Sequence, residues 1–374
     1  MKKYLIVLLS LFLLFNATYA QTETEKSALE KAKIAEDNQD YEEALKWFKK
    51  ANSINPKNGS IYYDIAWCQN ELARYAEVLR TAEAGVTVEP TVNLYNEYAY
   101  ALYMLERYSE AIEKYKKAQA INNEDKNTIK GMADSYFSMK DYKNAEVYYR
   151  KCLELGKDSK IANYKIGYIM NENKNYQKAI DYELAALKLD NDYAEAYNEL
   201  AYAYSRLNQK SKALDSYLKA HNLNPKSALY AANVADMYYG ESEVKNLDKA
   251  IEYYKKSLAI DNKSAVSNFN IGWVLNEKQN YMEAKPYLYK AVELDPTYAD
   301  AWIELGWIDY SEGSYAAAEA DYLKALQYNA KSELARYYLG QVYIKQKKNS
   351  NAQKMLDELK SMNSAYADKL KAKM

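Results

Sequence analysis

Histidine and cysteine, which commonly carry acid–base or metal chemistry, are sparse in this chain of 374 residues, and His221 is its sole histidine. General acid–base catalysis and zinc binding need several such groups held close together, and no partner is spaced near His221 at catalytic or ligand intervals. His221 follows Ala220 near the predicted end of a helix, where an imidazole can interact with the terminal carbonyls. We expect it to be structural.

The other groups with reactive chemistry are equally unpromising. Cys68 and Cys152 are the only cysteines, and their places in the pattern described below are too distant for a disulfide, so we expect two unpaired, buried thiols. Phosphate-binding glycine loops, a dinucleotide fingerprint and a G-x-S-x-G motif are absent, and ten glycines leave little material for them. The 52 carboxylates are typical of solvated helix faces. The sequence therefore predicts no enzyme, no metal site and no cofactor.

Aromatic residues are the abundant group with binding chemistry, since the chain contains 42 tyrosines. Their faces pack on apolar and planar groups, and the polar edge of tyrosine can hydrogen-bond. Many of these rings have a structural explanation, because they recur at one position, which we predict to begin a helix. That set is Tyr41, Tyr75, Tyr108, Tyr142, Tyr176, Tyr281 and Tyr315.

A spacing of 34 residues defines the elements that position these rings. Intervals between ten equivalent residues are 34, apart from one of 33 and one of 37. A period of this length indicates that one supersecondary unit is repeated along the chain. The 37-residue interval places three extra residues within 240–248, in the seventh copy. The ten residues are Ala44, Val78, Ala111, Ala145, Ala179, Ala213, Ala250, Ala284, Ala318 and Ala352.

Each copy predicts two helices joined by a turn. In the ninth copy, apolar residues follow a helical period from Trp302 to Tyr310, a turn falls at Gly313, and the period resumes at Ala318. A small residue marks the first helix of every copy from the second onward, as expected where two helices cross closely. These residues are Ala66, Ala99, Ala133, Gly167, Ala201, Ala235, Gly272, Gly306 and Gly340.

These residues resemble the tetratricopeptide repeat family, whose pattern W-x2-L-G…A-x3-F…P is matched by Trp302-x2-Leu305-Gly306 and by Ala44-x3-Phe48 with Pro56. The resemblance implies an all-α, right-handed α-solenoid of helix-turn-helix repeats. It covers ten repeats over about 25–362. We expect one solenoid over 21–374, closed by a polar capping helix at 363–374.

The first twenty residues predict a signal peptide. Lys2 and Lys3 precede an apolar run from Tyr4 to Phe15, and small residues end at Ala20, after which cleavage is expected. The alternative is an uncleaved membrane anchor, but this run is short against the roughly 20 residues that span a bilayer. We therefore expect an exported protein, periplasmic or extracellular, with no stable membrane span after cleavage.

Net charge argues against nucleic-acid partners. The precursor carries −1, and loss of Lys2 and Lys3 leaves −3, with no basic stripe along the repeats. The mature chain contains no second hydrophobic run long enough to span a membrane.

A second set of aromatic residues predicts a binding groove. In proteins that resemble this one, first helices line a concave surface, and the exposed row follows the small residue by one, flanked by residues four before and three after it. The alternative is that these rings pack between neighbouring first helices. The predicted binding residues are Tyr63, Trp67, Tyr100, Tyr103, Phe137, Tyr164, Tyr168, Tyr202, Tyr239, Phe269, Trp273, Trp307 and Tyr310.

Carboxylates outnumber basic residues on the same predicted surface, so we expect an acidic groove. The Lys, Asn and Arg clamp with which some family members hold a carboxyl terminus is missing from successive copies. The sequence thus predicts an exported, non-enzymatic scaffold that binds a protein or extended peptide. A cell-wall or extracellular glycan is the alternative ligand, because aromatic faces stack on sugar rings and Asn, Asp and Glu bind hydroxyls.

Overall fold

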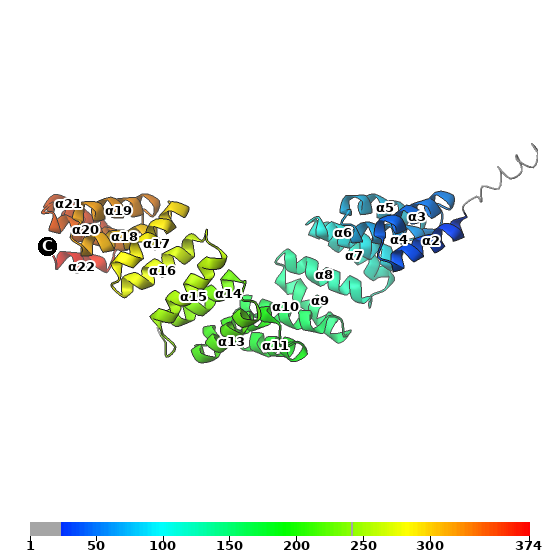
Figure 1. The fold of residues 1–374 in the computed structure, drawn as a ribbon, viewed down its shortest axis with the longest axis horizontal. Coiled ribbons are helices and arrows are strands. Elements are labelled where there is room, and N and C mark those ends of the chain that lie inside the picture. Colours follow the sequence, from blue (N-terminus) through cyan, green and yellow to red (C-terminus); the bar gives the residue numbers. More distant parts are fainter. Residues whose placement is uncertain (1–23, 241) are drawn as a thin grey trace, which may run out of the picture. The chain divides into compact units, whose positions relative to one another are not determined.

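The structure of the protein is a computed structural model that describes residues 24–240 and 242–374. The predicted signal peptide, residues 1–20, lies outside the described residues. Within the described ranges the chain forms 21 helices and no strand, arranged as successive antiparallel pairs (Figure 1). The even-numbered helices α2 to α20 are the first helices of the repeats, and the odd-numbered helices α3 to α21 are the second helices.

The chain divides into two compact units, with the boundary between Ile169 and Met170. Unit 1 contains α2 (Glu25–Asp37), α3 (Tyr41–Ile54), α4 (Gly59–Glu71), α5 (Tyr75–Val88), α6 (Val92–Met104), α7 (Tyr108–Ile121), α8 (Lys126–Ser138), α9 (Tyr142–Glu154) and most of α10 (Ser159–Glu172). Unit 2 contains α11 (Tyr176–Leu189), α12 (Ala194–Arg206), α13 (Lys210–Leu223), α14 (Ala228–Tyr239), α15 (Leu247–Ile260), α16 (Ala265–Glu277), α17 (Tyr281–Leu294), α18 (Ala299–Ser311), α19 (Tyr315–Tyr328), α20 (Glu333–Lys345), α21 (Asn349–Ser361) and α22 (Tyr366–Lys371).

The periodic residues of the sequence form the core of every repeat. All ten members of the 34-residue series, from Ala44 to Ala352, are 0% exposed. Each of the seven tyrosines predicted to begin a second helix is the first residue of one, from Tyr41 in α3 to Tyr315 in α19. The predicted helix-turn-helix solenoid is therefore confirmed. Whether residues 21–374 form one solenoid with a cap at 363–374 stays a prediction.

Close helix crossings explain the small residues of the first helices. A Cβ atom added to Gly272 would lie 2.6 Å from Cγ of Leu288, and one added to Gly306 would lie 2.9 Å from Cε1 of Tyr322. Both distances are below ordinary van der Waals contact. A larger residue at either position must displace a side chain that is fully buried in the adjoining second helix.

The turn inside each repeat uses a left-handed residue that the sequence pattern did not reveal. One residue with φ near +60° stands two positions before the second helix, and such a residue commonly ends a helix. It is glycine only at Gly313. The others are Gln39, Ala73, Glu106, Lys140, Lys174, Asn208, Gln279 and Lys347. The seventh copy departs from this turn because its extra residues separate α14 from α15, as the interval of 37 predicted.

Two further expectations concern burial. Cys68 and Cys152 are free and buried, as predicted. Burial raises the pKa of both thiols to about 12, so they remain protonated at neutral pH. None of the helices in the described part of the chain is long and apolar enough to cross a membrane.

Candidate functional site

The residues that follow the small residues form the most exposed aromatic row of the first helices. Tyr100 is 42% exposed, and Tyr202 and Trp273 are each 39% exposed, although the alanines before Tyr100 and Tyr202 are fully buried. A step of one residue turns the side chain by about 100° around a helix, away from the tight crossing. We call this row and its neighbours one turn away the first-helix face of each unit.

Tyrosines at the start of the second helices hold several of these rings by one edge. The contacts are T-shaped, which is a preferred geometry for aromatic pairs. Such a contact orients the ring while leaving other parts of its surface in solvent. The pairs, with ring-centroid distances, are Tyr41 with Trp67 at 5.4 Å, Tyr75 with Tyr100 at 6.4 Å, Tyr142 with Tyr168 at 6.2 Å and Tyr176 with Tyr202 at 6.1 Å.

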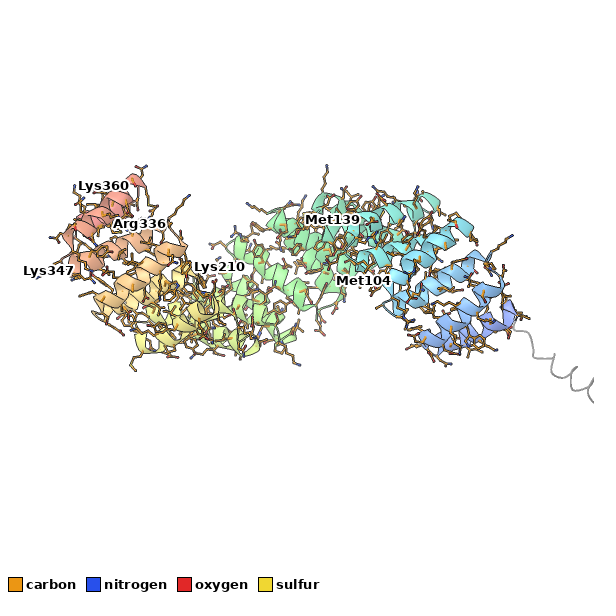
Figure 2. The ribbon with its side chains drawn as sticks, turned by 90° about the horizontal axis from the view of Figure 1, so that it is seen from above. Met104, Met139, Lys210, Arg336, Lys347 and Lys360 are labelled. Carbon is orange, nitrogen blue, oxygen red and sulfur yellow. The ribbon has the colours of Figure 1, made fainter. Side chains whose placement is uncertain are left out.

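A cavity of about 530 Å³ opens on the first-helix face of unit 1, among α4, α6, α7 and α8. It brings together three predicted binding residues, Trp67, Tyr100 and Tyr103. Met104, which is labelled in Figure 2, also lines it. Gly131 of α8 makes room for the ring of Tyr115, since a Cβ there would lie 2.1 Å from Cζ of that ring. The remaining lining residues are Asn70, Glu71, Asn96, Glu97, Asn127, Lys130 and Asp134.

The charges of this cavity are unbalanced. Its lining includes three carboxylates, Glu71, Glu97 and Asp134, and one ammonium group. That ammonium, on Lys130, is 2.6 Å from a carboxylate oxygen of Asp134, and Asp134 also accepts a hydrogen bond from the hydroxyl of Tyr149 at 2.7 Å. The carboxylates of Glu71 and Glu97 have no ion-pair partner in the described part of the chain. Burial raises the pKa of Glu97 above its ordinary value, against the opposing effect of a hydrogen bond from Asn70.

A second cavity of unit 1, of about 470 Å³, has a different character. Phe137 and Tyr168 line it with ring centroids 5.4 Å apart, and Tyr103 is shared with the first cavity. Lys165 places its ammonium 4.0 Å from the centroid of Phe137, which is a cation–π contact. Burial lowers the pKa of Lys165. The local charge is therefore partly cationic.

Two predicted binding residues of unit 1 lie apart from both cavities. Tyr63 is half-buried and packs against the core residues between α4 and α5. Tyr164 is half-buried, with the ammonium of Lys165 5.4 Å from its ring centroid. Both rings are partly committed to internal packing.

In unit 2 the predicted residues form one cavity and two aromatic clusters. Tyr202 lines a cavity of about 400 Å³ with Tyr217, Asp236 and Lys210. Lys210 is labelled in Figure 2. Trp273 packs against Tyr239 at 5.1 Å and against Phe269 at 5.5 Å. Phe269 is only 7% exposed, because it also packs on Tyr298, so its ring belongs to the interior of the unit. The other cluster joins Trp307 to Tyr310, at 6.0 Å, and to Tyr338, at 5.0 Å.

Carboxylates on this face are held by neutral amides at three equivalent places. The carboxamide nitrogen of Asn70 donates to a carboxylate oxygen of Glu97 at 2.7 Å and to its main-chain carbonyl at 3.1 Å. Each pair joins two successive first helices, and the arrangement recurs every third repeat. The other pairs are Asn171 with Glu199, at 3.0 Å, and Asn276 with Glu304.

The sequence predicted an acidic face but not the pairing of its carboxylates with asparagines. The signal was present: the segments 67–71, 168–172 and 273–277 read WCQNE, YIMNE and WVLNE. The chain thus has, in addition to the 34-residue period, a longer period of three repeats. Burial raises the pKa of Glu199, and that of Glu304 to about 7.

Within residues 24–240 and 242–374, His221 has no acid–base partner. It is buried near the end of α13, its ring packs edge-on against Tyr253 at 5.5 Å, and burial lowers its pKa. Over the described ranges, no group of three or more His, Cys, Asp and Glu side chains is placed to hold a metal ion.

Comparison with known families decides what kind of repeat this is. Family models described as "Tetratricopeptide repeat" match residues 26–58, 131–158, 194–227, 242–264, 269–333 and 334–362, together more than half of the chain. The chain belongs to the tetratricopeptide repeat family. The fourth, fifth and seventh copies depart most from the family pattern but keep its helix pair, because Ala145, Ala179 and Ala250 are buried like their equivalents.

Solved structures with a similar fold are also tetratricopeptide-like. The C-terminal part of a TPR repeat-containing protein from Cytophaga hutchinsonii is 18% identical, with 65% of this chain and 99% of that chain covered and a TM-score of 0.55. PilF of Pseudomonas aeruginosa is 18% identical, covering 58% and 98%, with a TM-score of 0.50. PilW, described as a type IV pilus biogenesis factor, is 18% identical, covering 57% and 99%, with a TM-score of 0.50. These likenesses show the fold.

Proposed function

We propose that this tetratricopeptide protein is an exported, non-enzymatic scaffold whose first-helix face binds a segment of a protein or peptide. The observation that carries the proposal is the row of aromatic rings represented by Tyr100, Tyr202 and Trp273. Each is about two-fifths exposed and is packed against a neighbouring ring.

Exposed rings of this kind are expensive to leave in water and gain most from a partner. Aromatic residues are enriched among the few interface residues that dominate binding energy, and an anchored ring loses little conformational entropy on binding. The T-shaped contacts provide that anchoring before the partner arrives. The face of unit 1 adds a cavity of about 530 Å³ beside Trp67 and Tyr100, into which a side chain of the partner can insert.

Export rests on the sequence of residues 1–20, with Lys2, Lys3 and the apolar run before Ala20. The N-terminus of the protein purified from its own host tests this part. Mass spectrometry of the mature chain should show Gln21 as its first residue, whereas a retained Met1 contradicts cleavage.

Binding is tested with a matched pair of double variants. Tyr100→Ala with Tyr202→Ala removes two exposed rings of the first-helix face, while Tyr289→Ala with Tyr328→Ala removes two exposed rings of second helices. Tagged mature protein recovered from the host envelope should retain its partner in the wild type and the second variant, and lose it in the first. Equal retention by both variants contradicts the proposal.

A glycan array run with the same proteins tests the alternative ligand. Sugar binding that depends on Tyr100 and Tyr202, without a recovered protein partner, replaces the protein-binding proposal with the glycan one. Thermal unfolding of each variant provides the folding control.

A further inference from the structure

The charged residues and the aromatic rings that line the unit 1 cavity together limit the kind of ligand that it can bind. Tyr100 and Trp67 present aromatic surface, while Glu71 and Glu97 present carboxylates that no cation of the described residues balances. Lys130 is the one cationic residue of the lining, and its ammonium is already bonded to Asp134. Aromatic faces and carboxylates that lack a cationic partner both attract cations, so the two features select the same kind of group.

A separate observation points to a hydrogen-bond donor. Asn70 lines the cavity and is only 5% exposed, and its carboxamide oxygen accepts no hydrogen bond from the described residues. Its nitrogen is fully engaged by Glu97. A buried acceptor without a partner is unfavourable, so an occupant rich in N–H groups is favoured here.

The same arrangement recurs in unit 2, where Ala232 replaces Lys130 and Lys210 lines the cavity beside Tyr202. Glu199 and Glu304 are held by Asn171 and Asn276, and the oxygens of both amides are again buried and unpartnered. An exposed or half-buried ring follows each glutamate by three residues, one helical turn later. These rings are Tyr100 after Glu97, Tyr202 after Glu199 and Trp307 after Glu304.

Building on the proposed function, we infer that the first-helix face reads arginine side chains of an extended partner, with a guanidinium at each Asn–Glu–aromatic set. A guanidinium is planar, stacks on aromatic rings and carries five N–H donors, which suits a carboxylate, an amide oxygen and a ring at once. An ammonium matches the charge but neither the planarity nor the number of donors.

The test uses fluorescein-labelled hexa-arginine, hexa-lysine and the neutral isostere hexa-citrulline, measured by anisotropy at about 150 mM salt, where long-range attraction is screened. Hexa-arginine should bind most tightly and hexa-citrulline least. The triple variant Glu97→Gln, Glu199→Gln, Glu304→Gln should bind hexa-arginine about tenfold or more weakly, because each glutamine keeps the bond from its asparagine and loses the charge.

A matched variant separates this effect from net charge. Glu113→Gln, Asp181→Asn and Asp215→Asn remove three exposed carboxylates from the second helices α7, α11 and α13 and should change hexa-arginine affinity less than twofold. Equal losses in both triple variants overturn the inference, as does hexa-lysine or hexa-citrulline binding as tightly as hexa-arginine. The peptide comparison needs only wild-type protein, so it decides the question even if the triple variant unfolds.

Absence of hexa-arginine binding also overturns this inference, but it leaves the proposed function to the partner-capture experiment. A partner that is captured through Tyr100 and Tyr202 while hexa-arginine does not bind shows a working face with a different ligand preference.

Discussion

The part of the unit 1 cavity that lies among α6, α7 and α8 is equivalent to the unit 2 cavity among α12, α13 and α14, three repeats later. Both contain an exposed tyrosine from a first helix, a buried tyrosine from a second helix, and a carboxylate that accepts a hydrogen bond from a tyrosine of the next second helix. The equivalent residues are Tyr100 and Tyr202, Tyr115 and Tyr217, Asp134 and Asp236, and Tyr149 and Tyr254.

The two cavities differ at the residues around this shared frame. Tyr103, Lys130 and Gly131 of unit 1 are replaced in unit 2 by Ser205, Ala232 and Asn233. In unit 1 Lys130 neutralises Asp134, and the uncompensated charge belongs to Glu71 and Glu97. In unit 2 the carboxylate of Asp236 has a tyrosine partner and no lysine of its own helix. The comparison indicates that the repeat builds the frame and that neighbouring positions set each cavity's charge and shape.

The largest expected effect concerns unit 2, where Trp307 stands at the position of Tyr100 and Tyr202 and Trp273 occupies the same row one repeat earlier. Trp273→Ala with Trp307→Ala should abolish partner capture, since truncation of a tryptophan hot spot often costs about 2 kcal/mol or more. Trp273 is 39% exposed, so helicity by circular dichroism should be nearly unchanged. Unfolding of the variant, or capture that survives, shows that the two rings serve the core instead.

Exchanging one residue between the two cavities should damage unit 1. Gly131→Asn, which introduces the residue of unit 2, places a Cβ against the ring of Tyr115 and should lower the free energy of unfolding by about 1–3 kcal/mol. Hydrogen exchange in α8 locates the loss. In a Tyr115→Leu background Gly131→Asn should destabilise the protein less. An unchanged loss of stability means that contact with the Tyr115 ring is not its cause.

A buried carboxyl group in unit 2 has no counterpart in unit 1. Glu183 of α11 is 0% exposed, both of its oxygens lack a hydrogen-bond partner within the described ranges, and it stands where the pattern has Phe or Tyr. The position three repeats earlier is Ala82. Glu183→Leu should stabilise unit 2 by about 1–2 kcal/mol, because it replaces a buried polar group with an apolar one. Chemical denaturation, together with hydrogen exchange in α11, measures the change in stability. A less stable variant contradicts the view that the buried Glu183 carboxyl group destabilises unit 2.

Burial also makes unit 2 sensitive to pH. Burial, with the nearby charge of Glu199, raises the pKa of Glu183 to about 10, above its value in an unfolded chain. The native state therefore keeps a proton that the unfolded state loses, so the free energy of unfolding should fall as pH rises from about 5 to 9. Tyr193 and Glu199, the other titrating groups near Glu183, also have raised pKa values. Glu183→Leu should make the free energy of unfolding nearly independent of pH over this range. An equal slope in wild type and variant means that another group causes the pH dependence.

The smallest expected effect compares one turn position in the two units. Ala73 of unit 1 has φ of 54°, where unit 2 uses Gly313 in the equivalent turn. Ala73→Gly should stabilise unit 1 by up to about 1 kcal/mol, because a left-handed conformation is strained for residues with a Cβ. Gly313→Ala is the reverse control in thermal unfolding. A destabilised Ala73→Gly variant indicates that unfolded-chain entropy outweighs the strain.

The fold was predictable because packing repeats strictly, whereas the site was only partly predictable. Ala44 and its nine equivalents face tight crossings that tolerate small residues, so their spacing appears in the sequence. Exposure of Tyr100 and burial of Phe269 depend on which neighbouring ring each one meets, and Tyr298 belongs to a loop outside the periodic rows. The bond between Asn70 and Glu97 joins two repeats, so a comparison within one 34-residue period does not show it.

The central claim is that a partner lies on the first helices, and site-specific photo-crosslinking in the host tests it most directly. p-Benzoylphenylalanine is placed at Tyr100 or Tyr202 on the first-helix face, and at Tyr289 or Tyr328 on second helices as controls. The account predicts a covalent adduct of one partner from positions 100 and 202 and none from 289 and 328. Adducts from 289 and 328 alone would contradict it.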